Sequence, residues 1–121
     1  MAIQRILIVD DSPTERYYLT DILVRSGFSV STAENGEEAL VKIKADKPQL
    51  ILMDVVMPGA NGFQVTRAIA KDPELQDVPV IICSSKNQET DRIWGIRQGA
   101  KDYLVKPVDA AELLAKIAAL G

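Results

Sequence analysis

The 121-residue chain contains no histidine and a single cysteine, Cys83. Without histidine, neither a Ser-His nor a Cys-His dyad can form, and no imidazole can bind zinc or accept phosphate. One cysteine excludes an intrachain disulfide, and its position inside an apolar run favours a small core residue over a reactive thiol. Any catalysis must therefore depend on carboxylates, a lysine, hydroxyls or a bound metal.

The chain also lacks long hydrophobic runs and an excess of positive charge. Its apolar runs have at most about five residues, too few for a transmembrane helix or a signal peptide. Lys and Arg number 14 against 17 Asp and Glu, which gives a formal net charge of −3. The sequence contains no basic cluster that could neutralise a row of nucleic-acid phosphates. We therefore expect a cytoplasmic protein that does not insert into a membrane and does not bind nucleic acid directly.

Length and composition predict a single domain over residues 1–121. A chain of this size can bury roughly two-thirds of its extended-chain surface. Hydrophobic residues make up 47% and charged residues 26% of the chain, which is typical of a globular protein. Helical spacing continues almost to Gly121, and no linker or low-complexity segment interrupts the chain, so we expect no second domain.

Five short apolar runs alternate with segments of helical spacing. The runs suit buried strands, and they cover residues 6–9, 28–30, 50–53, 80–83 and 103–105. The first helix begins with Ser12-Pro13-Thr14-Glu15, which matches a capping box with proline at the first helical position, and Asp109 or its neighbour can cap the last helix. Five strand-helix repeats predict an α/β fold with a doubly wound parallel sheet and helices on both faces.

Reactive residue types lie at the ends of four expected strands. Asp10 and Asp11 follow the first strand, Asp54 the third, Ser84 the fourth and Lys106 the fifth. In open parallel sheets, ligands bind outside the carboxyl ends of the strands, where the strand order reverses. If the first and third strands are neighbours, as in the order 2-1-3-4-5, three carboxylates converge, which is costly unless a cation holds them. Oxygen ligands with room for water favour Mg²⁺ or Mn²⁺.

These groups suit phosphoryl chemistry. A carboxylate can act as nucleophile and form an acyl phosphate, while a metal and an ammonium offset charge on the phosphoryl oxygens. Asp54 is the best nucleophile because it ends the central strand, Lys106 supplies the ammonium, and Ser84 can bond a phosphoryl oxygen. Taken singly, the acidic pair can be a helix cap and Asp54 a turn residue. Their joint placement at one sheet edge favours the phosphoryl site.

The motifs resemble the receiver domains of two-component response regulators, of which CheY is the stand-alone type, over about residues 5 to 119. The shared motifs are Ile6-Leu7-Ile8-Val9-Asp10-Asp11, Leu52-Met53-Asp54, Met57-Pro58-Gly59, Gly62, Ser84, Gly99-Ala100, Tyr103 and Lys106-Pro107. The resemblance implies a flavodoxin-like fold with strand order 2-1-3-4-5 and a cis bond before Pro107. It also implies that Asp54 is the phosphoacceptor and that Asp11, Asp54 and the backbone carbonyl of Val56 bind Mg²⁺. Asp10 would assist through water, and Mn²⁺ can substitute.

The resemblance further implies a monomeric switch rather than an enzyme. A histidine kinase donates the phosphoryl group, Lys106 contacts it, Ser84 moves toward it and Tyr103 turns inward. A downstream effector protein then reads the surface of the fourth helix, fifth strand and fifth helix. Val56 and Lys86 occupy positions that tune dephosphorylation in this family by controlling access of water.

A narrower resemblance is to the PilH group, regulators of type IV pilus twitching motility. It is seen in Asp11-Ser12-Pro13-Thr14-Glu15, in Asn61-Gly62-Phe63-Gln64, and in Gln88-Glu89-Thr90-Asp91-Arg92 with Trp94-Gly95. Because the expected fourth helix belongs to the switching surface, we hypothesise that Glu89, Arg92 and Trp94 contact a partner. The alternative is that Trp94 is packed in the core, the usual place for tryptophan.

Other interpretations start from the same fold class. A phosphatase of the haloacid dehalogenase type requires a second aspartate two residues after the nucleophile, where this chain has Val56. A flavin- or nucleotide-binding protein can share the fold, but neither glycine-rich phosphate-binding motif occurs. The alternative that stays open is the receiver portion of a larger regulator, with a DNA-binding or enzymatic output domain.

Overall fold

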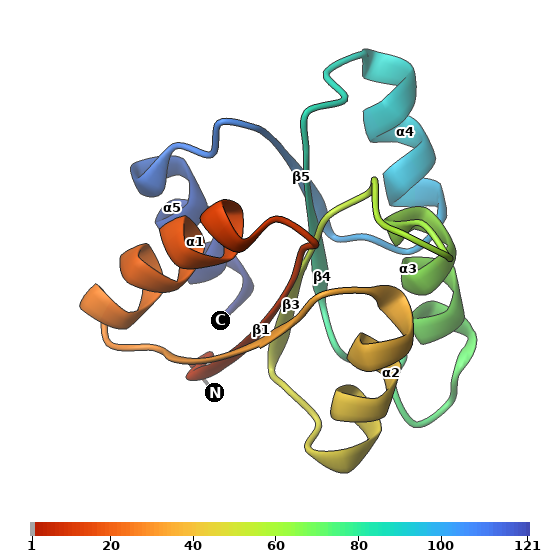
Figure 1. Cartoon of the computed structure of the whole chain (residues 1–121), viewed down its shortest axis with the longest axis horizontal. Helices are drawn as coiled ribbons and strands as arrows, with labels where there is room; N and C mark the ends of the chain where they lie inside the picture. Colours follow the sequence, from red (N-terminus) through yellow and green to blue (C-terminus); the bar gives the residue numbers. More distant parts are fainter. Residues whose placement is uncertain (1) are drawn as a thin grey trace.

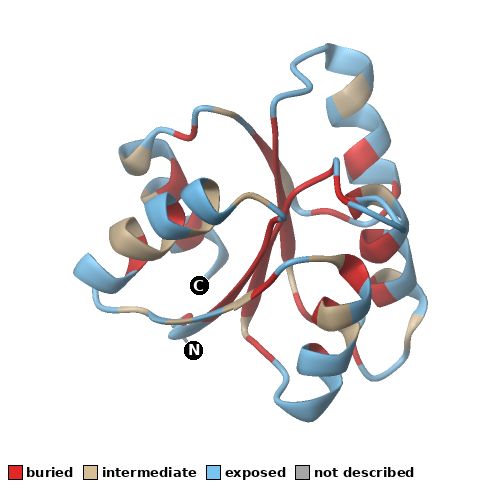
Figure 2. Ribbon diagram, in the orientation of Figure 1, coloured by how far each residue is buried: buried red, intermediate tan, exposed pale blue. Residues whose placement is uncertain are grey.

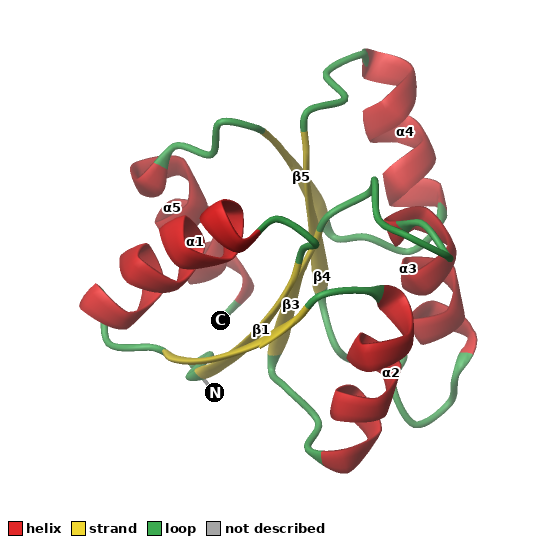
Figure 3. Ribbon diagram, in the orientation of Figure 1, coloured by secondary structure: helices red, strands yellow, loops and turns green. Residues whose placement is uncertain are grey.

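A parallel five-stranded sheet lies between two helical layers in the computed structural model, which describes residues 2–121 (Figure 1). The strands are β1 (Arg5–Val9), β2 (Ser29–Ala33), β3 (Leu50–Met53), β4 (Val80–Ser84) and β5 (Asp102–Val105). The helices are α1 (Pro13–Arg25), α2 (Gly36–Ala45), α3 (Gly62–Lys71), α4 (Glu89–Arg97) and α5 (Ala110–Leu120). The strand order β2-β1-β3-β4-β5 confirms the predicted doubly wound fold (Figure 3).

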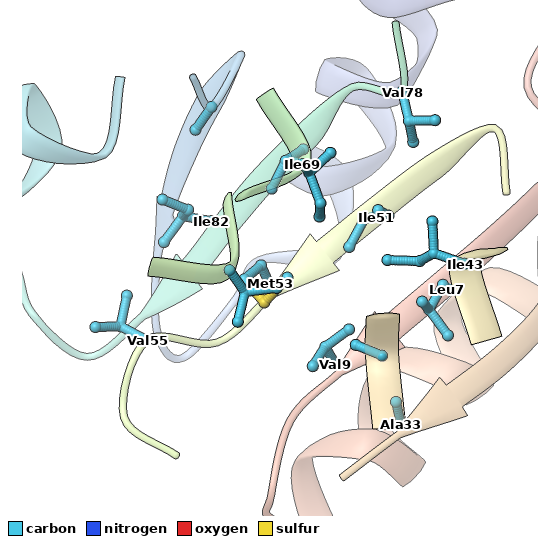
Figure 4. Close-up of a cluster of buried hydrophobic side chains, with 14 of the residues drawn as sticks. Leu7, Val9, Ala33, Ile43, Ile51, Met53, Val55, Ile69, Val78 and Ile82 are labelled. Carbon is cyan, nitrogen blue, oxygen red and sulfur yellow. The ribbon is translucent and has the colours of Figure 1, made fainter. Parts of the chain in front are cut away.

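The core forms on both faces of the sheet because successive strand residues point to opposite sides. Helices α1 and α5 cover one face, and α2, α3 and α4 cover the other (Figure 1). In β3, Ile51 and Met53 belong to the α2–α3 side (Figure 4). Leu50 and Leu52 belong to the α1–α5 side. All four are at most 1% exposed, so the continuous apolar run predicted for a buried strand is confirmed (Figure 2).

The second strand is displaced from its predicted position. We expected residues 28–30, but β2 begins at Ser29 and continues through Ser31 and Thr32 to Ala33. β2 is an edge strand with alternating exposed and partly buried residues. A search for apolar runs misses such a strand, because polar residues that face solvent alternate with the covered ones.

The first helix begins as predicted with proline at its first position, but its capping box is only half formed. The hydroxyl of Ser12 accepts a hydrogen bond from the N–H of Glu15 at 3.2 Å. The reciprocal bond is absent, because the N–H of Ser12 donates to Asp10 Oδ1 at 2.9 Å instead. The other expected cap is confirmed, since Asp109 Oδ2 accepts from the N–H of Glu112 at 2.9 Å.

Gly62 fixes the loop that follows β3. Its N–H donates to the carbonyl of Val55 at 2.8 Å. A Cβ atom at this position would lie 1.9 Å from the carbonyl oxygen of Asp54, a backbone atom that cannot move aside. The absence of a side chain therefore allows α3 to start directly against the residue that ends β3.

Among residues 2–121, no helix combines the length and the apolar composition that a bilayer-spanning segment requires.

Candidate functional site

The carboxyl ends of β1 and β3 place two aspartates side by side. Val9 pairs with Met53 in the parallel register, so Asp10 and Asp54 both follow directly at the same edge. The N–H of Asp54 donates to the carbonyl of Val9 at 2.8 Å, which continues the ladder to this residue. Both aspartates are buried, with exposed fractions of 2% and 6%.

Asp11 completes a cluster of three carboxylates. One oxygen each from Asp10, Asp11 and Asp54 lies within 4.8 Å of the others. Asp11 is exposed, so the cluster opens to solvent on one side. Hard carboxylate oxygens together with a side open to water are the donor set that Mg²⁺ takes in proteins, so these residues fit that ion.

Lys106 reaches the cluster from the end of β5. Its ammonium nitrogen lies 2.8 Å from Asp10 Oδ2 and 3.1 Å from Asp54 Oδ1. The structure thus brings together residues from the ends of three strands, as predicted for this edge. The peptide bond between Lys106 and Pro107 is cis, as the family resemblance implied.

Burial and charge act in opposite directions on these groups. Burial, followed by the charge of Asp10, raises the pKa of Asp54, and Lys106 only partly offsets the rise. Burial works against the ammonium of Lys106, but the hydrogen bond and charge of Asp10, with those of Asp54, outweigh it and raise the pKa of Lys106. The site therefore holds two buried carboxylates with one cation, and its electrostatic environment favours additional positive charge.

Arg16 supports the same edge and was not predicted from the sequence. Its guanidinium donates to the backbone carbonyl of Asp10 at 2.8 Å and pairs with Glu34 Oε1 at 3.2 Å. This contact fixes the end of β1 against α1. No spacing rule points to a bond between a side chain and a backbone carbonyl six residues earlier, which is why the sequence did not reveal it.

Ser84 and Tyr103 both bond to Lys86, in the loop between β4 and α4. The hydroxyl of Ser84 accepts from the N–H of Lys86 at 3.1 Å, and the phenol of Tyr103 donates to the carbonyl of Lys86 at 2.8 Å. Tyr103 is only 6% exposed, and burial raises the pKa of its phenol. The inward position of Tyr103 is thus compatible with this fold, while its turn on phosphorylation stays a prediction.

Two further predicted residues lie at or beneath the site. Val56 lies two residues after the phosphoacceptor candidate in the loop after β3 and is 62% exposed, and as a valine it presents no polar side-chain group at this position. The role of its backbone carbonyl as a metal ligand stays a prediction. Cys83 is 1% exposed and belongs to the core on the α1–α5 side, which confirms the prediction of a core residue. Burial also raises the pKa of its thiol to about 12, so the thiolate is disfavoured.

The three residues proposed for a partner surface lie on α4. Trp94 is half exposed, so its alternative placement in the core is wrong. Arg92 and Glu89 are both exposed, with Arg92 Nη1 3.6 Å from Glu89 Oε1. The buried residue of this helix is Gly95, whose missing side chain leaves room for Ile82 and Tyr103. Helix α4 therefore contributes no fully buried side chain to the core, and half of the tryptophan surface is open to solvent.

A surface hollow of about 530 Å³ lies away from this cluster. Residues around the amino-terminal ends of the strands line it, among them Arg5, Lys47, Asp77 and Lys101. None of the three clustered aspartates belongs to it. We assign the candidate site to the three carboxylates and Lys106, because together they can bind a divalent cation and a phosphoryl group. The hollow contains none of these residues.

Comparisons with known proteins agree with the fold. Residues 6–118 match the family model described as the response regulator receiver domain. The chain is 56% identical to the protein PilH of Pseudomonas aeruginosa over 96% of both chains. It is 40% identical to the response regulator PleD of Caulobacter vibrioides, of which it spans only 26%.

Two solved structures of CheY proteins share the whole architecture. The chemotaxis protein CheY4 of Vibrio cholerae is 29% identical, with a TM-score of 0.91 over 99% of this chain and 100% of that one. The CheX-CheY-BeF3-Mg complex of Borrelia burgdorferi has a chain that is 31% identical, with a TM-score of 0.89 over 97% of this chain and 88% of that one.

Replacing Asp54 with Asn should stabilise the metal-free protein. We expect the free energy of unfolding in EDTA to rise by about 1 to 2 kcal/mol at neutral pH, because the amide does not repel Asp10. The pKa of folded Asp54 is raised, so ionisation costs stability as pH increases from the unfolded-state pKa through the folded-state pKa. The advantage of the variant should therefore grow over this acid range and then level off. Urea unfolding at several pH values measures it.

When Mg²⁺ is added, the free energy of unfolding should rise more for the wild type than for Asp54→Asn. A ligand that binds only the folded state adds about 2.7 kcal/mol at one hundred times its Kd, and Asp54→Asn should gain less because one carboxylate is lost. KCl of matched ionic strength is the control. A variant less stable than the wild type in EDTA at neutral pH would contradict the repulsion inferred here.

Proposed function

Because the chain belongs to the response regulator receiver family, we propose that Asp54 is the residue through which it works as a phosphorylation-controlled switch. The supporting observation is the ammonium of Lys106, which lies within hydrogen-bond distance of both Asp10 and Asp54 at the carboxyl edge of the sheet. A phosphoryl group on Asp54 would meet this ammonium directly.

The donor in this proposal is the phosphohistidine of a histidine kinase. A carboxylate oxygen of Asp54 forms a bond to phosphorus, the P–N bond of the donor breaks, and its electron pair stays on the imidazole nitrogen. Lys106 neutralises charge on the phosphoryl oxygens, and Ser84 donates its hydroxyl hydrogen to one of them. The product is an acyl phosphate on this chain.

Receiver domains bind Mg²⁺ at an acidic pocket, and here Asp10, Asp11 and Asp54 form that pocket. We propose that Asp11, Asp54 and the backbone carbonyl of Val56 hold the ion directly and that Asp10 assists through water, with Mn²⁺ as a substitute. When bound, the ion supplies positive charge that offsets the charge of the phosphoryl oxygens. Asp54 is rigidly held for the transfer because it extends the ladder between β1 and β3.

The output of the proposed switch is the surface of α4, β5 and α5. Phosphorylation biases a domain that samples two arrangements, and Ser84 and Tyr103 are the residues proposed to link the site to this surface. A downstream effector protein reads the change. We propose a role in type IV pilus twitching motility because the chain is 56% identical to PilH over 96% of both proteins.

The protein in this proposal is a monomeric receiver domain over residues 1–121 that works in the cytoplasm as a switch and not as a turnover enzyme. The second candidate is the receiver part of a larger regulator, because the chain spans only 26% of PleD and 50% of the DNA-binding regulator MtrA of Mycolicibacterium smegmatis. The length of the complete gene product distinguishes the two.

Incubation with a small acyl phosphate and Mg²⁺ tests the site directly. Intact-mass measurement should show one added phosphoryl group on the wild type and none on Asp54→Asn. Asp46→Asn, which changes an exposed aspartate remote from the site, should behave as the wild type. Phosphate uptake by Asp54→Asn to the level of the wild type would refute the assignment of Asp54.

Replacing Val56 with Asn should shorten the lifetime of the phosphorylated state. The exposed valine offers no group that orients a water molecule toward phosphorus, whereas an amide does. We expect the decay rate of the phosphoprotein to rise by roughly tenfold, less than the roughly 10²- to 10⁴-fold of a general base, because an amide orients the water without taking its proton. Mass spectrometry after removal of the phosphodonor follows the decay, and equal rates in the two proteins would remove this role of position 56.

Replacing Trp94 with Ala should disconnect the switch from its partner. The variant should take up phosphate at the wild-type rate, because α4 contributes no group to the carboxylate cluster. It should fail to restore twitching zones in a strain that lacks the gene. Val41→Ala is the control, since it also truncates an exposed apolar side chain, on α2, where Val41 is 65% exposed. Full restoration by Trp94→Ala would exclude the proposed contact.

A further inference from the structure

One hydrogen bond joins α1 to the loop between β5 and α5. The phenolic O–H of Tyr18 donates to the backbone carbonyl of Val108 at 2.6 Å, across 90 positions of sequence. Nothing in the function proposed above uses this contact, and no sequence motif points to it. It lies on the face of the sheet where α1 and α5 run side by side (Figure 1).

The loop held by Tyr18 is the one that contains Lys106. The N–H of Lys106 donates to the carbonyl of Ser84 at 2.8 Å, and α5 begins after its cap at Asp109. Between these two anchors lie Pro107, which has no N–H, and Val108. Within the described residues 2–121, the bond from Tyr18 is the only hydrogen bond to this pair.

The side chains around this bond separate its polar part from its packing part. Val108 is 1% exposed and packs into the core shared by α1 and α5, so its apolar contacts persist without the phenol. Tyr18 is 41% exposed and therefore contributes less to the core than a buried aromatic residue would. The hydrogen bond from the hydroxyl constrains the position and orientation of the Val108 carbonyl. Packing of the valine side chain alone does not determine that orientation.

We propose that Tyr18 is a positioning residue for Lys106: its hydroxyl holds the loop after β5 so that the Lys106 ammonium stays aimed at the Asp54 carboxylate. This inference rests on the proposed function, in which Lys106 contacts the phosphoryl group. A lysine has four rotatable side-chain bonds, so its reach depends on where the backbone places its Cα. Small displacements of a charge-stabilising group reduce transfer rates strongly, because the stabilisation requires contact geometry.

Tyr18→Phe and Tyr17→Phe form a matched pair of variants. Each removes one hydroxyl and retains the ring, but Tyr17 is 75% exposed and, among the bonds of residues 2–121, its hydroxyl has none. Two quantities separate positioning of Lys106 from a general structural effect. Titration with Mg²⁺ alone reports the three aspartates, and titration with beryllofluoride at saturating Mg²⁺, followed by NMR, adds the contact with Lys106.

We expect Tyr18→Phe to weaken beryllofluoride binding by roughly three- to tenfold, the effect of losing one hydrogen bond. The rate of phosphate uptake from a small acyl phosphate should fall in proportion. The affinity for Mg²⁺ should stay within about twofold of the wild type, and Tyr17→Phe should match the wild type in every measurement.

A double-mutant cycle identifies the route of the effect. In a Lys106→Ala background, Tyr18→Phe should cause no further loss of beryllofluoride affinity, since the group that it positions is gone. An equal loss in both backgrounds would overturn the proposal, as would a Tyr18→Phe variant that matches Tyr17→Phe or loses Mg²⁺ and beryllofluoride affinity alike.

The test also distinguishes the two levels of inference. If the wild type takes up no phosphate and binds no beryllofluoride, the proposed function itself is wrong, and the role of Tyr18 falls with it. If the wild type does both and Tyr18→Phe equals it, only the role of Tyr18 is wrong.

Discussion

The ion pairs of Lys106 with Asp10 and Asp54 are the interaction on which the site depends. The parallel register of β1 and β3 forces two buried carboxylates together, because Val9 and Met53 are neighbours and an aspartate follows each of them. Like charges at this separation oppose folding, and one ammonium from the end of β5 compensates only part of the repulsion. The register of β1 and β3 therefore creates a site that favours the binding of a further cation at this edge of the sheet.

This constraint also explains how the two faces of the sheet divide their tasks. On the α1–α5 face, Tyr18 and Val108 fix the loop that presents the ammonium. On the opposite face, Tyr103 packs beneath α4 and bonds to the carbonyl of Lys86, close to where Ser84 ends β4. Contacts on the α1–α5 face thus position the ammonium of Lys106, and Tyr103, which is proposed to signal phosphorylation, packs on the opposite face.

The sequence predicted those parts of the structure that depend on residue type and order. Strand-helix alternation determined the doubly wound sheet, and the strand ends identified Asp10, Asp54 and Lys106, because carboxyl ends of parallel strands share an edge. The sequence did not predict bonds from Arg16 and Tyr18, since both donate to backbone carbonyls, which every residue possesses.

The incomplete capping box of α1 has the same kind of cause. The motif predicted a return bond from Glu15, but Asp10 takes the N–H of Ser12, a competition that becomes visible only once β1 and α1 are placed in space. The displacement of β2 arose differently. Its polar residues belong to an edge strand, where alternation replaces a continuous apolar run.

The shallow burial of α4 has a mechanical consequence. Gly95, which has no side chain, is the one buried residue of this helix, so partly exposed residues such as Ile93 and Ile96 provide its apolar contacts. By contrast, α1 and α5 are anchored by leucine and isoleucine side chains that are at most 3% exposed, and elements with fewer buried apolar contacts open at a lower free-energy cost. The helix with the fewest buried residues is therefore also the one that the proposed switch uses as part of its output surface.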